Sequence, residues 1–346
     1  MKTAILAILM FCIMIFPHEL GHFIAAKKCN VKVNEFAFGM GPTVWKKQRG
    51  ETLHSIRLFP IGGFCAMEGE EGDSEDERAF NHKKPWQKII ILAAGSTMNL
   101  LCALLIMSAI NGFYGCTTTT LDGVEDGGAA AAAGLEVGDK IVSMTTDAGQ
   151  FDIEKWTDIS TALTGIEDGE SITVEYKRDG ELATASMTPK LVESTDSEGN
   201  TTTRYVLGIT CKISHSPIKA LINGTKSTWS LTVTMFQSFR QLFTGGIGAD
   251  DLTGPVGMVQ MVGQTNQYGF TYYVSLVALI CINLAILNML PLPALDGGRI
   301  IFVLYSWITG KPVSEKVEGT IHLIGLGLLF LLMIYITFND VIRIVE

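Results

Sequence analysis

Charged side chains are scarce in this sequence. Only 18% of its 346 residues are Asp, Glu, Lys or Arg, whereas 47% are hydrophobic. A chain this apolar is not a typical soluble enzyme, and its composition favours a membrane protein that carries a polar insert. The net charge is −9, and the basic residues form no stripe with interleaved aromatics. Both observations argue against nucleic acid as a partner.

The sequence also lacks a CxxC pair and a signal-peptide cleavage site. The seven cysteines include no CxxC pair, and Cys12, Cys102 and Cys281 lie in apolar runs. We therefore interpret the cysteines as small buried hydrophobic residues. The apolar run that follows Lys2 resembles the start of a signal peptide, but no A-x-A-like cleavage site comes after it. We expect residues 3–27 to be a retained transmembrane helix.

Four segments are long and apolar enough to span a bilayer, namely residues 3–27, 88–112, 269–292 and 319–338. The section between the first two is rich in positive charge, whereas the section after the second is acidic. The positive-inside rule then predicts that the first section is cytoplasmic and that both chain termini lie outside. The positive charges include Lys27, Lys28, Lys46, Lys47, Arg49, Arg57, Lys83, Lys84 and Lys88.

The acidic section, residues 113–216, has the pattern of a small β-rich extracytoplasmic domain. Alternating residues predict strands at 140–144 and 171–176, and Asp179-Gly180 indicates a hairpin turn. A short helix is expected at 158–163, and the polar tract 193–203 is expected to be a flexible loop.

Two further segments complete the expected organisation. Residues 31–69 alternate apolar and polar residues around turn-rich glycines, which predicts a β-hairpin region associated with the membrane. Residues 217–243 predict an amphipathic helix on the membrane surface. We therefore divide the chain into an N-terminal membrane half (1–112), the inserted domain (113–216) and a C-terminal membrane half (217–346).

The first apolar segment contains the sequence His18-Glu19-Leu20-Gly21-His22. On a helix, His18 and His22 project from one face, so their imidazoles can hold one Zn²⁺ while Glu19 acts as general base. Ionisable residues are costly at membrane depth, so they indicate function there. The pattern predicts a peptidase that works within the bilayer.

A hydrolytic zinc site needs a third protein ligand and one open position. Asp296 is the only acidic residue in or near the third apolar segment. It follows prolines that break a helix and precedes Gly297-Gly298, which allow close backbone approach. Both Asp296 and the histidine motif lie at predicted cytoplasmic ends of their spans. Asp296 is therefore the predicted third ligand.

Several motifs, in order along nearly the whole chain, resemble the site-2 protease family of intramembrane zinc metalloproteases, most closely the bacterial four-span type. The motifs are HELGH at 18–22, GMGP at 39–42, RLFPIGGF at 57–64, MEGE at 67–70, GSTMN at 95–99, GPVG at 254–257 and LDGG at 295–298. Residues 133–144 are similar to part of a PDZ domain. The expected fold is an α-helical membrane protein with four transmembrane helices, a membrane-associated β-hairpin region and an inserted β-rich PDZ-like domain.

The resemblance also implies the roles of individual residues. His18, His22 and Asp296 would bind one Zn²⁺ per chain, Glu19 would be catalytic, and Asn288 would hold substrate. Gly62 and Gly63 would let the backbone of an unwound substrate approach closely. The implied substrates are transmembrane segments, such as those of anti-sigma factors or remnant signal peptides. The implied location is a bacterial cell membrane, with the active site near its cytoplasmic side.

Two other functions stay open at this point. One is a non-proteolytic membrane adaptor, whose PDZ-like domain recruits partners and whose metal site is vestigial. The other is a metal transporter, which predicts further polar residues along a path through the spans, and the spans show few. Four histidines, His54, His82, His215 and His322, are interpreted as surface or helix-end residues.

Overall fold

The computed structural model describes residues 2–70, 72, 74–195, 201–245, 253–311 and 313–345. The chain folds into two compact units. The first unit joins Met1–Ala109 to Gly224–Glu346, and the second is Ile110–Asn223. The first unit therefore contains both of the regions that we expect to lie in the membrane.

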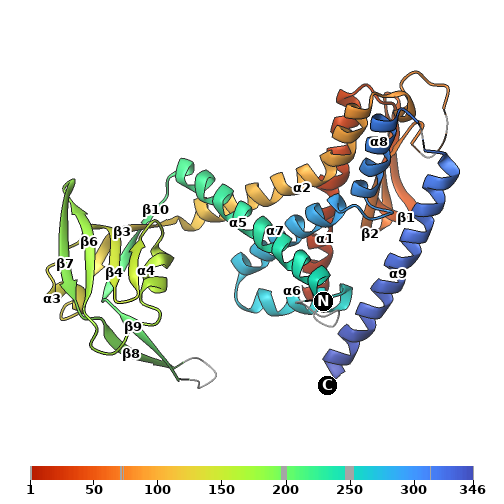
Figure 1. The fold of residues 1–346 in the computed structure, drawn as a ribbon. Helices are drawn as coiled ribbons and strands as arrows, with labels where there is room; N and C mark the ends of the chain where they lie inside the picture. Colours follow the sequence, from red (N-terminus) through yellow and green to blue (C-terminus); the bar gives the residue numbers. More distant parts are fainter. Residues whose placement is uncertain are drawn as a thin grey trace. The chain divides into compact units, whose positions relative to one another are not determined.

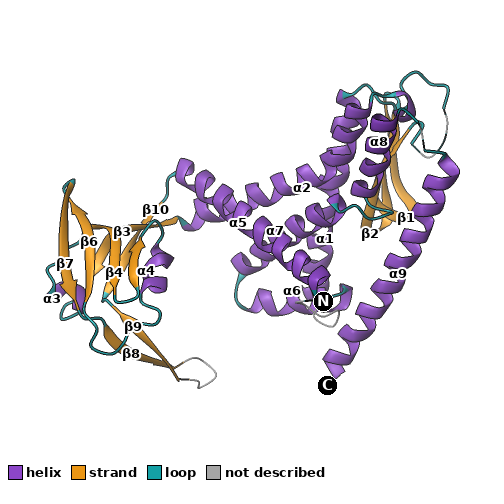
Figure 2. Ribbon diagram, in the orientation of Figure 1, coloured by secondary structure: helices purple, strands orange, loops and turns teal. Residues whose placement is uncertain are grey.

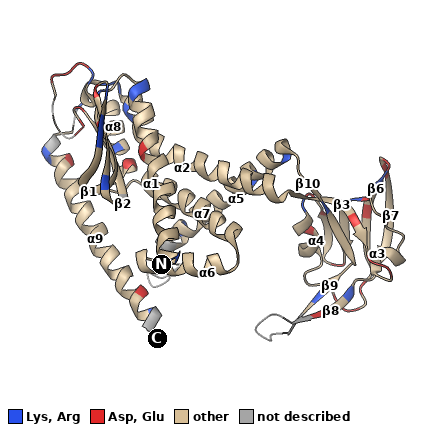
Figure 3. Cartoon of the chain, turned by 180° about the vertical axis from the view of Figure 1, so that it is seen from behind, with Lys and Arg blue, Asp and Glu red and all other residues tan. Residues whose placement is uncertain are grey.

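The first unit contains helices that are long and apolar enough to cross a membrane (Figure 1). They are α1 (Lys2–Lys28), α2 (Pro85–Tyr114), α7 (Phe270–Met289) and α9 (Glu315–Val345), the last of which contributes Lys316–Arg343 to a candidate span. These four helices coincide with the four segments predicted from the sequence. Few Lys and Arg residues lie along these helices. In this unit they gather at the end of α1 and along the neighbouring strands (Figure 3).

An apolar core joins α1 to α7 and to the shorter helix α6 (Pro255–Gln267). Met10 of α1 and Tyr273 and Ile282 of α7 are almost fully buried in it. The Tyr273 hydroxyl donates a hydrogen bond to the Leu6 carbonyl at 2.9 Å. This bond satisfies a polar group that burial would otherwise leave unpaired, and it fixes the two helices relative to each other.

Strands β1 (Val33–Arg49) and β2 (Thr52–Met67) form the expected hairpin after α1 (Figure 2). The strands bend, so that residues 35–38 pair with residues 63–66 on one side and with residues 53–56 on the other. Residues 63–67 pair on one side only. A short 3-10 helix at Phe80–His82 precedes α2.

The chain unwinds between α7 and α8 (Asp296–Thr309), as the prolines in this segment predict. Ala294 has a φ of 71°, an uncommon conformation for a residue with a β-carbon. A β-carbon on Gly297 would lie 2.2 Å from the Leu290 carbonyl oxygen. Glycine at this position therefore lets the first turn of α8 fold back against the end of α7.

The second unit is built on a six-stranded sheet with the order β10-β3-β4-β6-β7 and β5 beside β4. Ile141, Met144, Ile172 and Val174 are completely buried in its core. Ile172 and Val174 of β6 follow the period-2 alternation of a strand, whereas β4 has a register shift between Ile141 and Ser143. Two helices, α3 and α4, contribute further core residues. The elements are β3 (Cys116–Val124), α3 (Ala129–Ala132), β4 (Lys140–Thr146), β5 (Gly149–Asp152), α4 (Trp156–Ala162), β6 (Ile172–Arg178), β7 (Glu181–Met187) and β10 (Ile209–Ser214).

The prediction of a loop at 193–203 is wrong for its described residues. Strands β8 (Lys190–Thr195) and β9 (Thr201–Val206) pair in register, with Glu193 opposite Thr203. Threonine favours strands, so a polar, threonine-rich segment can pair as a two-stranded ribbon with few apolar residues. Residues 196–200 lie outside the described part of the chain.

The predicted helix near 217–243 is α5 (Pro217–Thr244), which exposes Ile218, Trp229 and Phe236.

Candidate metal centre

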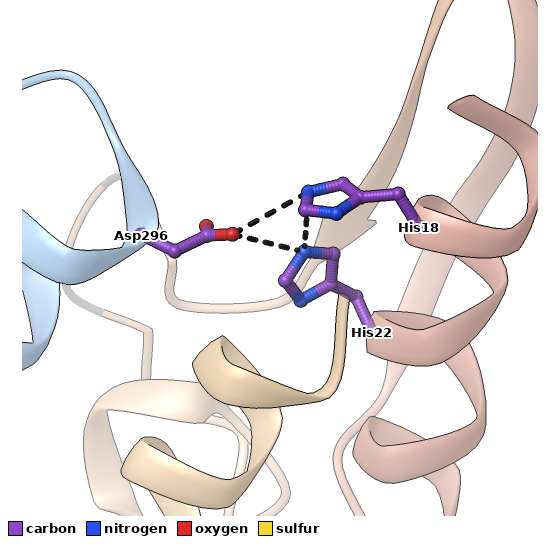
Figure 4. Close-up of side chains that lie close together, drawn as sticks. All are labelled: His18, His22 and Asp296. Atoms are coloured by element: carbon purple, nitrogen blue, oxygen red, sulfur yellow. Dashed lines mark hydrogen bonds and ion pairs between the residues drawn. The ribbon is translucent and has the colours of Figure 1, made fainter. Parts of the chain in front are cut away.

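Three buried or half-buried side chains meet where α1 faces the start of α8 (Figure 4). The spacing of His18 and His22 places both rings on one face of α1, with their Nε2 atoms 3.2 Å apart. Asp296, the first residue of α8, places its Oδ2 3.4 Å from each of these nitrogens. The structure thus brings together the three residues that the sequence predicts as metal ligands.

The spacing of these three atoms fits a tetrahedral metal ion. An ion held about 2.0–2.1 Å from each ligand in that geometry separates the ligand atoms by about 3.3–3.4 Å. The separations here are 3.2, 3.4 and 3.4 Å. Asp296 Oδ2 is buried and has no hydrogen-bond partner among the described residues. Two imidazole nitrogens and one carboxylate oxygen are a donor set suited to Zn²⁺.

Neighbouring groups orient the two histidines. His22 Nδ1 lies 2.9 Å from the Ile91 carbonyl oxygen of α2, so this nitrogen carries the proton and Nε2 is free to bind a metal. Asn288, near the end of α7, places its Nδ2 3.3 Å from His18 Nε2. The predicted substrate-holding residue therefore lies directly beside the ligand cluster.

Gly95 of α2 lies against both histidines, a contact that the sequence did not identify. A β-carbon here would be 2.3 Å from His22 Nε2 and 2.7 Å from His18 Cε1. On the opposite side of the same contact, a β-carbon on Gly21 would lie 2.3 Å from the Ala94 carbonyl oxygen. The two glycines allow α1 and α2 to approach closely enough to enclose the imidazoles.

Glu19 lies between the ligand cluster and the edge of the hairpin. Its carboxyl interacts electrostatically with His18, His22 and Asp296. A β-carbon on Gly63 would lie 3.1 Å from Glu19 Cγ, whereas one on Gly62, whose φ is 90°, would meet Met40. Of the two predicted glycines, Gly63 is therefore the one that borders the site.

An ion pair fastens the start of α8 to the end of the hairpin region. Arg299, one turn after Asp296, donates a hydrogen bond from Nη1 to Glu70 Oε1. Burial acts to lower the pKa of Arg299, but Glu70 raises it above its ordinary value. Burial likewise acts to raise the pKa of Asp296, but its contacts with the two histidines hold that pKa below the usual range. Both groups thus stay charged near neutral pH.

A ligand cluster of this composition, on an apolar helix that carries HELGH, is consistent with the family named from the sequence motifs. The model of peptidase family M50 matches residues 6–332. The chain belongs to peptidase family M50. This confirms the predicted relationship to the site-2 proteases and the predicted metalloendopeptidase class.

Curated bacterial relatives cover this M50 chain almost completely. A protein of Fusobacterium nucleatum is 37% identical over 98% of each chain. One from Clostridium acetobutylicum is 35% identical over 98% of this chain and 97% of its own. Both are named as candidate zinc metalloproteases.

A solved PDZ domain from Listeria monocytogenes is 18% identical, covers 28% of this chain and 87% of its own, and has a TM-score of 0.20. That score carries no argument, so the PDZ-like assignment continues to rest on residues 133–144.

Membership in family M50 and the four apolar helices identify a membrane-associated metal enzyme that acts on protein substrates.

Proposed function

We propose that this M50 member is an intramembrane zinc metalloprotease that cleaves transmembrane segments of other membrane proteins. The convergence of His18, His22 and Asp296 carries the proposal, because two of these ligands project from a helix long and apolar enough to span a bilayer. One Zn²⁺ per chain would be held by the three residues, which leaves the fourth position open. When bound, zinc supplies Lewis-acid polarisation of the scissile carbonyl and makes water at its open position a nucleophile near neutral pH.

Glu19 is the proposed general base and acid. Its carboxylate would take a proton from the attacking water and pass it to the nitrogen of the leaving amine. Its position next to His18 and against Gly63 supports this role. Asn288, beside His18, would help to hold the substrate backbone.

The hairpin supports a way of presenting the substrate. A transmembrane helix hides its carbonyls in internal hydrogen bonds, so it must unwind before cleavage. Residues 63–67 pair on one side only and begin beside Glu19. An extended stretch of substrate could add to this edge as a further strand, and Gly63, which borders Glu19, would leave room for its backbone.

The proposed location is a bacterial cell membrane, with the hairpin and metal centre near the cytoplasmic side. The positive charges of residues 27–57 support this orientation. The second unit would then be extracytoplasmic and PDZ-like, and would admit only substrates already trimmed of their outer domains. Anti-sigma factors and remnant signal peptides are substrates of this kind.

A purified-protein assay tests the proposal. Zinc content and cleavage of a model transmembrane substrate are measured in detergent for the wild type, Glu19→Gln and Asp296→Ala. We expect zinc near one per chain, cleavage lost in both variants, and zinc strongly reduced only in Asp296→Ala.

Other outcomes separate the alternatives. Full cleavage by Glu19→Gln would contradict the assigned base. Absence of bound zinc from the wild type would favour the non-proteolytic adaptor, in which the second unit recruits partners. The metal-transporter alternative predicts polar residues lining a path through the bilayer, and the chain supplies few in α2 and α7.

A further inference from the structure

Helix α9 touches the unwound segment immediately before Asp296. The Ala294 N–H donates a hydrogen bond to His322 Nδ1 at 2.8 Å. Glu318 Oε1 lies 3.8 Å from Nε2 of the same ring. An acceptor at Nδ1 requires the proton on Nε2, and the nearby carboxylate favours that tautomer. His322 is thus not the surface or helix-end residue that its sequence position suggested.

A second contact lies one turn further along α9. Gly325 is buried, and a β-carbon there would lie 2.3 Å from Pro293 Cβ and 3.0 Å from the Pro293 carbonyl carbon. Gly327, two residues later, is exposed and has nothing within 4 Å of the corresponding position. The two glycines therefore differ in function: only Gly325 allows α9 to reach the segment before Asp296.

The start of α8 needs such support. Its N-cap residue, Leu295, makes no side-chain capping hydrogen bond. Ala294 holds a φ of 71°, which costs energy for a residue with a β-carbon. His322 also packs edge-on against Phe302 of α8, with ring centroids 5.5 Å apart. One side chain of α9 thus contacts both the strained residue and the helix that begins with Asp296.

We propose that His322 is a positioning residue for the metal centre, and that His322 and Gly325 together make α9 the support that fixes the third ligand. This inference rests on the proposed role of Asp296 as a zinc ligand. The hydrogen bond at Ala294 and the contact at Pro293 hold the two residues before Leu295, so they set the point at which α8 starts. Without them, Asp296 Oδ2 would no longer stay 3.4 Å from both imidazoles.

The test is the zinc affinity of the full-length protein in detergent, measured by competition with a chromogenic chelator. Gly325→Ala is compared with Gly327→Ala, a matched change on the same helix. His322→Leu, which removes the acceptor, is compared with His322→Asn, whose Oδ1 can replace Nδ1. Groups that orient metal ligands typically change affinity by about 10- to 100-fold when they are removed. We expect a loss of about tenfold or more for Gly325→Ala and His322→Leu, with Gly327→Ala and His322→Asn close to the wild type.

Three results would overturn the inference. Wild-type affinity in both Gly325→Ala and His322→Leu would show that α9 does not position the ligand. An equal loss in His322→Leu and His322→Asn would exclude the hydrogen bond as the cause. No zinc binding by the wild type would refute the proposed zinc site itself, and the inference with it. If Gly325→Ala does not elute as a monodisperse species, the pair of variants at position 322 decides the question.

Discussion

At the scale of single residues, the metal centre depends on the absence of a side chain as much as on its ligands. His18 and His22 need only the spacing of one helical turn, which the sequence shows directly. Their rings fit between α1 and α2 because Gly95 presents no β-carbon to them. That requirement arises from a contact between residues far apart in the chain, so no local pattern reveals it.

Gly95→Ala should therefore disrupt the proposed metal site. Its β-carbon would lie 2.3 Å from His22 Nε2, the atom proposed to bind the ion. We expect zinc affinity to fall by about tenfold or more, because the displaced rings no longer match the ligand geometry. Gly112→Ala on the same helix is the control, since its β-carbon would make an ordinary 3.7 Å contact. Chelator competition measures both, and equal affinities in the two variants would contradict the prediction.

At the scale of elements, the pair formed by Glu70 and Arg299 connects the end of β2 to α8. The two side chains are 16% and 28% exposed, so the pair lies between a surface and a buried salt bridge. Glu70→Ala and Arg299→Met should each lower the free energy of unfolding by about 1–3 kcal/mol, because each leaves one charge unpaired.

The double variant should lose less stability than the sum of the two single variants, because it leaves no unpaired charge. The measurement is reversible unfolding in mixed detergent and SDS. Lys27→Met, which breaks a more exposed pair with Glu51, should cost about 1 kcal/mol or less. Additive losses in the cycle would mean that the pair does not couple β2 to α8.

A buried carboxylate in the second unit predicts a pH dependence of stability. Asp139, which precedes β4, accepts hydrogen bonds from Arg178 Nε at 2.8 Å and Nη2 at 2.7 Å. The Arg178 guanidinium thereby holds the pKa of Asp139 below its usual range. This stabilisation is complete above the pKa of Asp139 in the unfolded chain, about 3.9. It is lost as the pH falls through the lower pKa of Asp139 in the folded protein.

Asp139→Asn should accordingly destabilise strands β4 and β6 at pH 7, by about 1.5–3 kcal/mol, and the difference from the wild type should narrow below pH ~4. Hydrogen exchange of the full-length protein, corrected for intrinsic rates, reports the protection of these strands at each pH. Asp152→Asn, at an exposed position of β5, is the control and should change little. A difference that persists undiminished at low pH would exclude the carboxylate charge as its source.

The success of sequence-based prediction also varied between elements, for physical reasons. The apolar helices could be predicted because each is one continuous hydrophobic run. The segment before α8 could be predicted because prolines and glycines mark it locally. Strands β8 and β9 were missed because their polar, threonine-rich segment has the composition of a loop. His322 was misassigned because its partner is a backbone N–H 28 residues away, which the sequence does not display.

At the scale of the whole molecule, the second unit is inserted between the two parts of the chain that supply the proposed ligands. His18 and His22 precede residues 110–223, whereas Asp296 follows them. The proposed metal centre therefore forms only when the two membrane halves assemble with each other. Among the described residues, α2 is the only candidate span that lies between the hairpin and the second unit along the chain.

The proposed orientation can be tested in intact bacterial cells with single-cysteine variants of a chain whose native cysteines are replaced. Lys47→Cys places the label on β1, and Glu181→Cys places it at the start of β7; both positions are exposed. Because α2 is the only candidate span between them among the described residues, the proposed topology predicts that the two labels react on opposite sides. The positive charges around β1 favour the cytoplasm, so a membrane-impermeant maleimide should label Glu181→Cys in intact cells and Lys47→Cys only after lysis. The reverse pattern would invert the orientation, and labelling of both in intact cells would show that α2 does not span the membrane.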